Sequence, residues 1–553
     1  MARLNIRVGG DSFRRVREQQ YVYVDKTPII EEMLATVPPE VSLITRPRRF
    51  GKTLMMSMLY EFFDISQDNR HLFEGLAISK NAALCEKWMN QYPTVLITFK
   101  DIEGNNYDET FEQLTACISD VLIKHTYLLE SDKVDPEDRE QLTLLKKKTG
   151  TRTDLIRSLM VLCRALQSFW GKPVIMLIDE YDVPINNAEQ KGYYEDIVNL
   201  MRNLLGRGLK SNTSLAFAVL TGCLRIARES IFTGLNNFAC YGISHAKFAD
   251  KFGFTQQEVD SLLQDADMPG KANLIREWYD GYRFGHSTEI YCPWDVLSYL
   301  NDLQIDQQAK PLTYWSNTSG NAIVRTLIER AGPETRDKIG DLLSGLAIEE
   351  KLTETLTYDC VYDNEANLWS MLYLTGYLTQ AAIQPDDDYT ALVIPNKEIK
   401  KIFKDTVWQW FDAHLDRNAL SPLVSALWDR DSNTVQETFT DILYDTISYH
   451  DSSENFYHGF IAGVLRGAGM RVKSNRESGL GRTDVTVTDP RNKRAIIIEL
   501  KRAVKFEDLD RMADEALAQI EDRKYAAGLP VNFKTILKYG ISFWGKECRV
   551  KLG

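Results

Sequence analysis

The chain has 553 residues, of which 44% are hydrophobic and 26% charged, a composition typical of a globular protein with room for about three or four domains. Its formal net charge of −12 argues against a nucleic-acid binder coated in positive charge, although a local basic channel is compatible with that total. The scattered cysteines argue against a zinc or disulfide framework, and the lack of an apolar run of about 20 residues or of an apolar signal core predicts a cytoplasmic protein that does not span a membrane.

The segment before residue 40 leads into the first buried strand. The alternation in residues 21–24, YVYV, predicts a short strand. A helix is then predicted to begin at Pro28, with Asp25 or Thr27 as its N-cap. This helix either packs beside a bound nucleotide or contacts the nucleotide directly, and the sequence leaves both alternatives open.

Residues 41–53, VSLITRPRRFGKT, have the order of strand, turn and helix start that a phosphate-binding loop requires. The helix that opens at Gly51 offers unpaired N–H groups and a positive dipole end to an anion. Lys52 is predicted to reach the β- and γ-phosphates of ATP, and Thr53 is predicted to hold Mg²⁺. The candidate nucleotide-binding residues of this loop are Arg46, Pro47, Arg48, Arg49, Phe50, Gly51, Lys52 and Thr53.

One position departs from the usual loop pattern. Arg46 stands where G-x-x-x-x-G-K-[ST] has its first glycine, so a side chain there is expected to narrow or re-aim the loop. The competing interpretation is a basic turn that precedes an ordinary helix.

A second buried strand that matters for this site covers residues 174–178, VIMLI, and ends in Asp179 and Glu180. A carboxylate at the end of such a strand is where a P-loop fold holds Mg²⁺, which is the role predicted for Asp179. Glu180 is predicted to polarise the attacking water. Residues 95–99 predict another strand, and the stretch of about 107–170 predicts helix, with a solvated or inserted segment at 130–148.

The strand predicted at residues 214–220 ends in Thr221, whose hydroxyl is a candidate for sensing the γ-phosphate. Arg225 and Arg228 follow, and either can contact phosphate charge in its own subunit or in a neighbour. Surface arginines on a helix are the competing interpretation. Strands that alternate with helices in this way predict a parallel α/β sheet.

Residues 245–440 change in pattern and are predicted to form a mostly helical middle or lid region. Thr255 and Glu258 have the spacing of a capping box. The aromatic run at 278–284 and the aromatic residues at 291–294 and 314–315 either stack on bases or pack in a core. A short β element is expected near residues 392–394.

The last hundred residues carry a second chemical pattern. A helix is predicted from Glu454, a glycine-rich turn at 475–482, a strand that starts with Asp484, and a buried strand at 495–501 that contains Glu499 and Lys501. Asp and Glu on adjacent strands form an oxygen site for Mg²⁺ or Mn²⁺, and Lys501, on the same face as Glu499, can orient a water for attack on a phosphodiester. A surface salt bridge in a hairpin domain is the alternative.

Two further observations concern the same region. Gln519 lies in a helix predicted at 514–525 and can face the carboxylates. Residues 466–505 contain eleven Lys or Arg and four Asp or Glu, a local net charge of +7 within a chain of net charge −12. A basic stretch around these carboxylates suits a nucleic-acid backbone.

The order of several motifs resembles a bacterial family, the AAA-ATPase-like proteins fused to a PD-(D/E)XK nuclease-superfamily domain. The motifs that carry the resemblance run from about residue 21 to the end of the chain: TRPRRFGKT, IMLIDEYD, LTGCLRIARESIFTGLNNF, REWYDGYRFG, NFYHGF, SNRESGLGRTDV, IIIELKRA and EALAQIEDRKYAAG. The family uses the RPRRFGK form of the loop, so Arg46 is compatible with membership but leaves ATP hydrolysis open.

The resemblance implies an α/β protein in three parts: an AAA+-like P-loop ATPase domain at 1–244, the helical middle region at 245–440, and a restriction-endonuclease-like α/β domain at 441–553. It assigns phosphate and Mg²⁺ binding to Lys52 and Thr53, and metal and water to Asp179 and Glu180. It also implies a nuclease triad of Asp484, Glu499 and Lys501 that is supported by Glu454 and Gln519.

The leading hypothesis is therefore an ATPase and Mg²⁺-dependent nuclease that binds nucleic acid, with DNA favoured over RNA. Mobile-element or phage-defence biology is the setting suggested by similar ATPase–nuclease fusions, and assembly into a homo-oligomer is left open. A regulatory NTPase switch that binds nucleic acid without cutting it is the second hypothesis. A binding or scaffold protein with two relic sites is the third.

Overall fold

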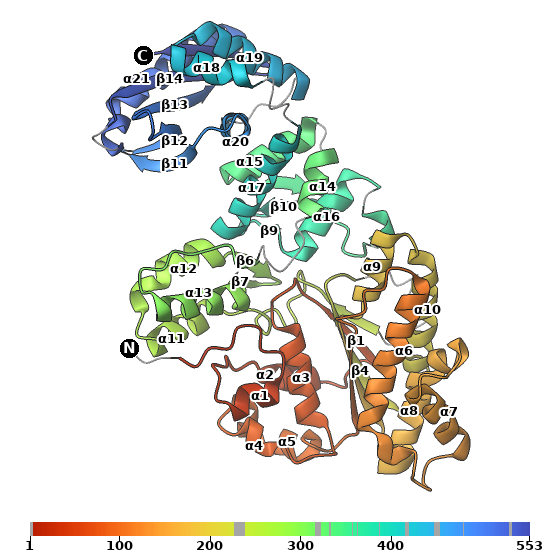
Figure 1. The fold of residues 1–553 in the computed structure, drawn as a ribbon. Coiled ribbons are helices and arrows are strands. Elements are labelled where there is room, and N and C mark those ends of the chain that lie inside the picture. Colours follow the sequence, from red (N-terminus) through yellow and green to blue (C-terminus); the bar gives the residue numbers. More distant parts are fainter. Residues whose placement is uncertain are drawn as a thin grey trace. The chain divides into compact units, whose positions relative to one another are not determined.

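The computed structural model describes residues 4–225, 238–315, 322–330, 333–356, 358–361, 363–385, 388–414, 420–446, 454–478, 481–529 and 533–553 (Figure 1). The chain forms two compact units. The first holds Met1–Ser319, Glu350–Thr390 and Pro395–Glu398, and the second holds Gly320–Glu349, Ala391–Ile394 and Ile399–Gly553. The three predicted domain ranges, 1–244, 245–440 and 441–553, stay a prediction.

A five-stranded sheet in the order β2-β3-β4-β1-β5 forms the centre of the first unit, and its neighbouring strands run parallel. Every residue of β1 and β3 is buried, as expected for a parallel sheet covered on both faces. The parallel sheet and four of its strands confirm the sequence-based prediction. The strands are β1 (Val41–Thr45), β2 (Thr94–Thr98), β3 (Val174–Asp179), β4 (Leu215–Gly222) and β5 (Phe238–Tyr241).

Helices cover both faces of this sheet (Figure 1). One group comprises α1 (Phe13–Glu18), α2 (Pro28–Leu34), α3 (Lys52–Phe63), α4 (Arg70–Phe73) and α5 (Ala82–Trp88). The other comprises α6 (Tyr107–Lys124), α7 (Pro136–Lys146), α8 (Arg152–Trp170), α9 (Val183–Lys191) and α10 (Tyr194–Leu209). The predicted helical stretch at 107–170 is thus divided into α6, α7 and α8, and α7 accounts for most of the charged segment at 130–148.

Local signals explain where several helices begin and end. Thr151 and Asp154 form a capping box at the start of α8, and Gly171 ends that helix in a left-handed conformation with φ of 71°. The predicted capping box of Thr255 and Glu258 is confirmed at the start of α11 (Gln256–Asp265). Pro28 occupies the first turn of α2 with Thr27 as the N-cap residue, which confirms that helix start.

The strand predicted at residues 21–24 is wrong, because this segment is extended but belongs to no sheet. The N–H of Tyr21 donates to the Val16 carbonyl and the N–H of Val22 donates to the Asn5 carbonyl, so local chain segments take its backbone bonds. The ring of Tyr23 packs against Phe13 at 5.3 Å between centroids. The alternation that suggested a strand therefore reflects side-chain packing of an irregular segment.

The rest of the first unit is mostly helical, with a short hairpin. It contains α11, α12 (Ala272–Tyr279), α13 (Pro293–Ile305) and α16 (Glu365–Thr375), together with the paired strands β6 (Tyr282–Phe284) and β7 (Ser287–Ile290). Short strands of the middle region are β8 (Ile348–Glu350), β9 (Thr379–Gln380) and β10 (Thr390–Val393), and β10 confirms the β element expected near residues 392–394. Within the described residues no helix is both long and apolar enough to cross a membrane.

The second unit is built on a mixed five-stranded sheet in the order β11-β12-β13-β14-β15. Only β13 and β14 pair in parallel, and the other neighbours are antiparallel. Its strands are β11 (Val472–Ser478), β12 (Gly481–Asp489), β13 (Arg494–Arg502), β14 (Thr535–Trp544) and β15 (Glu547–Leu552). The helices of this part of the chain are α14 (Ala322–Arg330), α15 (Pro333–Ser344), α17 (Lys397–His414), α18 (Ser421–Asp429), α19 (Ser432–Thr446), α20 (Glu454–Gly467) and α21 (Leu509–Asp522).

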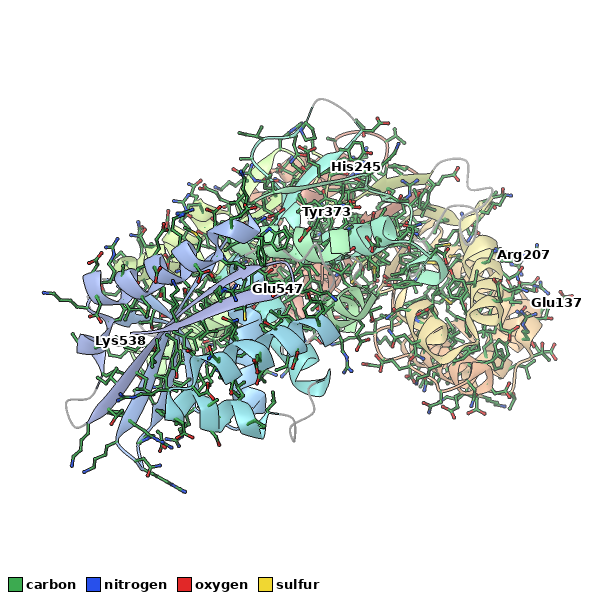
Figure 2. The ribbon with its side chains drawn as sticks, turned by 90° about the horizontal axis from the view of Figure 1, so that it is seen from above. Glu137, Arg207, His245, Tyr373, Lys538 and Glu547 are labelled. Atoms are coloured by element: carbon green, nitrogen blue, oxygen red, sulfur yellow. The ribbon has the colours of Figure 1, made fainter. Side chains whose placement is uncertain are left out.

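The glycine-rich turn predicted at 475–482 is mostly wrong. Residues 475–478 end β11 and residues 481–482 begin β12, and their pairing, for example Ser478 with Gly481, makes a hairpin whose tip lies outside the described residues. Consequently Asp484 lies within β12 rather than at its start. The side chains in Figure 2 give a second view of both units, with Glu137 on α7 and Arg207 on α10, and with Lys538 and Glu547 on β14 and β15.

Candidate functional site

The carboxyl ends of β1, β3 and β4 bring the predicted nucleotide-binding groups together, because these strands are parallel neighbours. The hydroxyl of Thr53, in the first turn of α3, donates to Asp179 Oδ2 across 2.7 Å. The hydroxyl of Thr221 donates to Asp179 Oδ1. Asp179 and Thr221 are both buried, whereas Thr53 is half-buried and is the most exposed of the three.

The loop between β1 and α3 curls around the side chain of Lys52. Its ammonium donates to the carbonyl oxygens of Arg46 and Pro47, both across 2.9 Å. Gly51, at the N-cap of α3, has φ of 87°, a left-handed conformation that favours glycine. Lys52 is only 3% exposed, and the first turn of α3 that it begins has backbone N–H groups of the kind that bind an anion.

The side chain of Arg46 points away from this space into the core. Its guanidinium is fully buried and donates to the carbonyls of Tyr241 and Phe248 across 2.8 and 3.1 Å. The rings of Phe252 and Phe284 lie 5.0 and 5.4 Å from it. Burial lowers the pKa of Arg46 to about 10, so it remains charged at neutral pH. Arg46 therefore supports the loop from the core, because its guanidinium hydrogen-bonds to backbone carbonyls there.

The other loop residues divide between core and surface. Phe50 is buried between the rings of Tyr282 and Phe284, at 5.0 and 5.2 Å between centroids. Arg48 is exposed, and the exposed guanidinium of Arg49 lies 4.0 Å from the ring centroid of Trp294. Phe50 thus anchors the loop, whereas the two arginines are available to a charged ligand.

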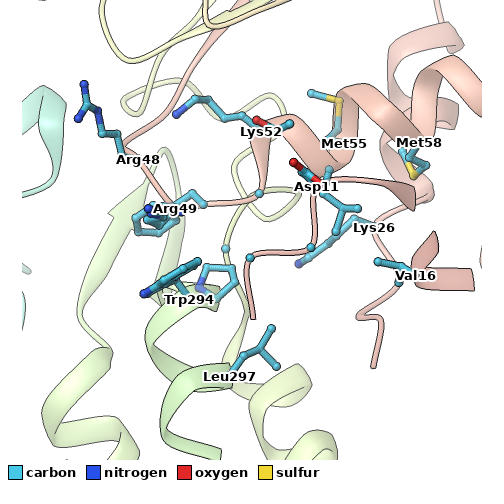
Figure 3. A pocket seen from close by; sticks show the side chains of 18 of the residues that line it. Asp11, Val16, Lys26, Arg48, Arg49, Lys52, Met55, Met58, Trp294 and Leu297 are labelled. Atoms are coloured by element: carbon cyan, nitrogen blue, oxygen red, sulfur yellow. The ribbon is translucent and has the colours of Figure 1, made fainter. Parts of the chain in front are cut away.

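A cavity of about 410 Å³ opens from the loop (Figure 3), a volume in the range of small-molecule and cofactor sites. Its phosphate-loop side is lined by Gly51, Lys52, Thr53 and Glu180. The rest of the lining comes mainly from the N-terminal segment, α3 and α13. It mixes apolar with charged side chains: Val16, Val22, Val24, Met58, Trp294 and Leu297 on the one hand, and Arg7, Asp11, Lys26, Lys100, Asp101, Glu103 and Lys251 on the other. The cavity therefore offers both charged and apolar side chains beside the predicted phosphate loop.

Glu180 lies at the edge of this cavity in a left-handed conformation with φ of 52°. Its N–H donates to the Thr221 hydroxyl across 3.4 Å. Burial raises the pKa of Glu180, and the neighbouring Lys52 acts against that rise. A carboxyl group with a raised pKa next to a phosphate site is suited to take a proton from water.

Asp182 and Tyr358 were missed by the sequence analysis. Asp182 Oδ2 accepts from the N–H groups of Cys223 and Leu224 across 2.9 and 3.1 Å and from the hydroxyl of Tyr358 across 3.0 Å. A Cβ on Gly222 would lie 2.7 Å from Asp182 Oδ1. Asp182 was visible in the motif IMLIDEYD, but no local pattern pairs it with a tyrosine 176 positions later. Together these groups hold the chain that follows β4 in place. Of the two arginines predicted there, Arg225 is among the described residues and Arg228 lies outside them.

The second candidate site lies in the second unit, on β12 and β13. Asp484 and Glu499 lie on these antiparallel strands, and Asp484 Oδ2 accepts from the N–H of Leu500 across 2.9 Å. Glu499 is 2% exposed. Burial raises the pKa of Asp484, and its hydrogen bond to Leu500 acts against that rise. The structure thus brings the two predicted carboxylates to adjacent strands, as the sequence indicated.

Lys501 and Gln519 complete the described part of this site. The Lys501 ammonium lies 4.0 Å from Glu499 Oε1, and Gln519 on α21 donates its amide to the same oxygen. The Gln519 amide also donates to the Tyr525 hydroxyl across 3.3 Å. The structure thus places the side chains of Lys501 and Gln519 beside Glu499, and their roles at a reaction centre stay a prediction. Glu454 begins α20, but its side chain lies outside the described residues.

His458 is a further residue that the sequence analysis missed. Its Nε2 lies 2.6 Å from the backbone oxygen of Asp484. Burial lowers the pKa of His458, which favours a neutral imidazole at neutral pH. His458 stands in the motif NFYHGF on the amphipathic helix α20, four positions after Glu454. Residues with this spacing share one face of a helix, so the spacing could have placed His458 on the same face as Glu454.

The donor set of this second site consists of oxygens, which suits Mg²⁺ or Mn²⁺. Asp484 and Glu499 would hold such an ion, and Gln519 would orient Glu499. Within the part of the chain that the structure describes, no group of three or more His, Cys, Asp and Glu side chains is arranged to hold a metal. The remaining ligands of an ion bound here would therefore be water, backbone or substrate oxygens.

Two family models each match one range of the chain. Residues 7–232 match the AAA-ATPase-like family, described as predicted AAA-ATPase, and residues 452–552 match the PD-(D/E)XK nuclease superfamily. A protein of Azotobacter chroococcum mcd 1, described as an uncharacterized protein in the vnfD 5' region, is 24% identical over 98% of this chain and 97% of its own length.

Two solved structures show weaker likeness. The ORC2 protein of Aeropyrum pernix, in ADPNP–ADP complexes, is 11% identical with a TM-score of 0.28, over 71% of this chain and 98% of its own. A Signal Transduction ATPase with Numerous Domains from Pyrococcus horikoshii, which has a tetratricopeptide repeat sensor, is 12% identical with a TM-score of 0.25, over 81% of this chain and 54% of its own.

The two family matches agree with the two sites, since the phosphate loop and Asp179 fall in the first match and Asp484, Glu499 and Lys501 fall in the second. The chain thus has a region similar to the predicted AAA-ATPases at 7–232 and a C-terminal region similar to the PD-(D/E)XK nuclease superfamily at 452–552.

Proposed function

We propose that this protein binds ATP at its phosphate loop and couples that site to metal-dependent cleavage of a nucleic-acid phosphodiester, with DNA as the preferred substrate. The single observation that carries the proposal is the set of Asp484, Glu499 and Lys501 on β12 and β13, in one chain with Lys52, Thr53 and Asp179. Each set has the residue types and spacing of its chemistry.

At the nucleotide site, Lys52 and the N–H groups at the start of α3 bind the phosphates. Thr53 and Asp179 would hold Mg²⁺, which would supply positive charge to the β- and γ-phosphates when it is bound. Glu180 holds a water near the γ-phosphate and accepts its proton, a role that suits its raised pKa. Thr221 keeps Asp179 in position through its hydroxyl.

At the nuclease site, Asp484 and Glu499 would hold one or two divalent ions, which would supply charge stabilisation to the scissile phosphate. Lys501 orients the attacking water through its ammonium. The hydrogen bond from Leu500 and the amide of Gln519 fix the two carboxylates, as the partners of metal ligands generally do. The basic residues between 466 and 505 attract the substrate backbone.

The decisive experiment is cleavage of labelled DNA and RNA oligonucleotides by purified protein with Mg²⁺ or Mn²⁺, with and without ATP. Asp484→Asn should abolish cleavage, whereas Asp489→Asn, on the same strand but paired with Arg494, should leave it unchanged. Lys52→Ala should remove the response to ATP. Metal-dependent cleavage that persists in Asp484→Asn would overturn the assignment of the nuclease site.

A second function is favoured by one observation, namely that the described residues bring only two carboxylates together at β12 and β13. We propose as the alternative a nucleotide-regulated switch whose C-terminal domain binds nucleic acid without cutting it. It predicts salt-dependent binding that responds to ATP, and no cleavage with any metal. The biological setting proposed for either function is mobile-element or phage-defence work, and an oligomer of this chain is compatible with both.

A further inference from the structure

The turn that leaves β13 exposes apolar side chains close to the candidate nuclease site. Val504 is 78% exposed and Phe506 is 46% exposed. The ring of Phe506 packs edge-on against Trp544, the last residue of β14, at 5.5 Å between centroids and 74° between planes. We call Val504, Phe506 and Trp544 the aromatic rim.

The aromatic rim is held in place by backbone contacts. The N–H of Ala503, which is buried, donates to the carbonyl of Phe543 across 2.8 Å, so the turn is tied to the end of β14. The N–H of Asp508 donates to the carbonyl of Lys505 across 3.1 Å and closes the turn that carries Phe506. The exposed apolar surface is therefore a fixed feature of the second unit.

Positive charge is interleaved with these apolar groups. Arg502 and Lys505 flank Val504 in sequence and are both exposed. On the hairpin that follows Trp544, the Lys546 ammonium lies 5.5 Å from the ring centroid of Tyr444, which is 48% exposed. Aromatic rings alternating with cations form the kind of surface that binds single-stranded nucleic acid, because bases stack on the rings and phosphates pair with the cations.

The acidic residues near the turn are partly neutralised by their own partners. Asp508 pairs with Arg511 across 2.9 Å, and Asp510 lies 3.7 Å from the Lys551 ammonium, whereas Glu507, next to Phe506, is exposed. These pairs reduce the repulsion that a polyanion would meet on approaching the aromatic rim. The net charge of +7 over residues 466–505 favours a polyanion as the occupant, and the exposed ring of Phe506 favours a polyanion that carries bases.

The position of the rim relative to the candidate reaction centre is fixed by the chain. Val504 follows Lys501 by three residues, so their Cα atoms lie within roughly 11 Å of each other. Such a distance corresponds to a few nucleotides of a strand. A base held at the rim would belong to the same strand as the phosphodiester held at Asp484 and Glu499.

We infer that the aromatic rim stacks unpaired bases of a single-stranded nucleic-acid segment, and that the substrate class of the nuclease site is a single strand or a single-stranded end. The inference rests on the proposed function for its catalytic meaning, but the binding surface itself is testable without cleavage. A fully paired duplex keeps its bases stacked on each other and would meet only the cations.

The test is binding of a fluorescently labelled single-stranded oligonucleotide, and of its blunt duplex, to the full chain in EDTA, so that no strand is cut. Two variants are compared with the wild type: the single variant Phe506→Ala, and the double variant that combines Val504→Ser with Phe506→Ala. Both should weaken single-strand binding by about 5- to 150-fold and change duplex binding by less than about twofold. Phe506→Tyr should retain most of the single-strand affinity because it retains the ring. Val37→Ser, which changes a valine 92% exposed in the first unit, is the matched control and should have no effect.

Each result decides the inference separately from the proposed cleavage. Equal losses on single strand and duplex, no loss on either, or no single-strand binding by the wild type would overturn the stacking surface. Asp484-dependent cleavage with unchanged binding by the Phe506 variants would leave the nuclease proposal standing alone. Ring-dependent single-strand binding without cleavage by any metal would support the stacking surface and overturn the nuclease proposal.

Discussion

The hydroxyl of Thr53 donates to Asp179 across 2.7 Å and so joins the first turn of α3 to the carboxyl end of β3. Both groups are candidates for the same Mg²⁺, and both are already oriented toward one point. The ammonium of Lys52, the first residue of α3, donates to the carbonyls of Arg46 and Pro47 in the preceding loop. These contacts place the predicted phosphate and metal ligands within one connected network.

The first prediction concerns that network. ATP with Mg²⁺ should raise the melting temperature of the wild type, because a ligand that binds only the folded state at 100 times its Kd adds about 2.7 kcal/mol of stability. Lys52→Ala should abolish most of this shift, since it removes the charge that faces the phosphates. Lys80→Ala, an exposed lysine of the same unit, should keep it. An unchanged ATP shift in Lys52→Ala would argue against this loop as the nucleotide site.

The second prediction concerns Arg46. Replacing it by alanine leaves the carbonyls of Tyr241 and Phe248 buried without their donor, at a cost of about 1–3 kcal/mol for each group. We therefore expect a clear fall in melting temperature, and the same fall for Arg46→Gly, although glycine matches the usual loop pattern. Arg48→Ala, at the exposed neighbour, should change stability by less than about 0.5 kcal/mol. A thermally neutral Arg46→Gly would show that the guanidinium has no structural role.

The third prediction concerns a buried carboxyl pair behind the loop, Asp295 on α13 and Glu398 at the start of α17. Burial, the largest cause, raises the pKa of both groups, and mutual repulsion adds to the rise at Glu398. Glu398 Oε1 accepts from the N–H of Trp315 across 2.8 Å. The folded protein therefore keeps a proton that the unfolded chain releases above a pH of about 4.

The sign of the pH dependence follows from that difference. Stability from this pair is fully present below the unfolded pKa and declines as the pH rises toward the raised folded pKa, by about 1.4 kcal/mol per pH unit for each retained proton. Melting temperatures between pH 5 and about pH 8 should thus fall more steeply in the wild type than in the double variant Asp295→Asn with Glu398→Gln. Glu277→Gln, at an exposed carboxylate paired with Lys397, should leave the slope unchanged. If the melting temperatures of the wild type and the double variant fall equally with pH, the interpretation that the folded pair retains a proton would be contradicted.

The fourth prediction concerns Gln519, which positions Glu499 through its amide. Gln519→Leu keeps the approximate volume of the side chain and removes that hydrogen bond, so cleavage or metal affinity should fall by about 10- to 100-fold. Raising the Mg²⁺ concentration should recover part of the loss, because the carboxylates remain. Gln519→Asn, with a shorter amide, should be intermediate, and Glu521→Gln on the same helix should behave as wild type. Full activity in Gln519→Leu would mean that Glu499 needs no such partner.

The sequence predicts the strands and the site positions where one local pattern carries the information. The apolar runs of β1, β3, β4 and β13 end in or contain the polar residues that the chemistry needs, and a parallel sheet then brings the ends together. The pairing of Gln519 with Glu499 followed from the helix after β13. Each of these elements places a charged residue on a buried strand. Burial of a charge costs folding free energy unless the charged group has a hydrogen-bond or ion partner.

The rest depends on contacts between distant segments, which no local pattern encodes. The burial of Arg46 is decided by carbonyls at positions 241 and 248, and the partner of Asp182 is Tyr358. The strand β5 is short and only partly buried, so its residues FACY carry little periodic signal. His458 contacts a backbone oxygen, and a backbone partner leaves no trace in the identity of the residue contacted.

The outer side of the phosphate loop is assembled from parts of the chain that follow it by 200 residues or more. The indole of Trp315 donates to the Arg48 carbonyl across 3.5 Å, the thiol of Cys292 contacts the Arg49 carbonyl, and a Cβ on Gly376 would touch Pro47 at 3.0 Å. Contacts of such long sequence separation close large loops and form late in folding. The loop between β1 and α3, which precedes Lys52, therefore takes its shape only after most of the first unit has been synthesised. Nucleotide affinity would thus report on completed folding of the chain.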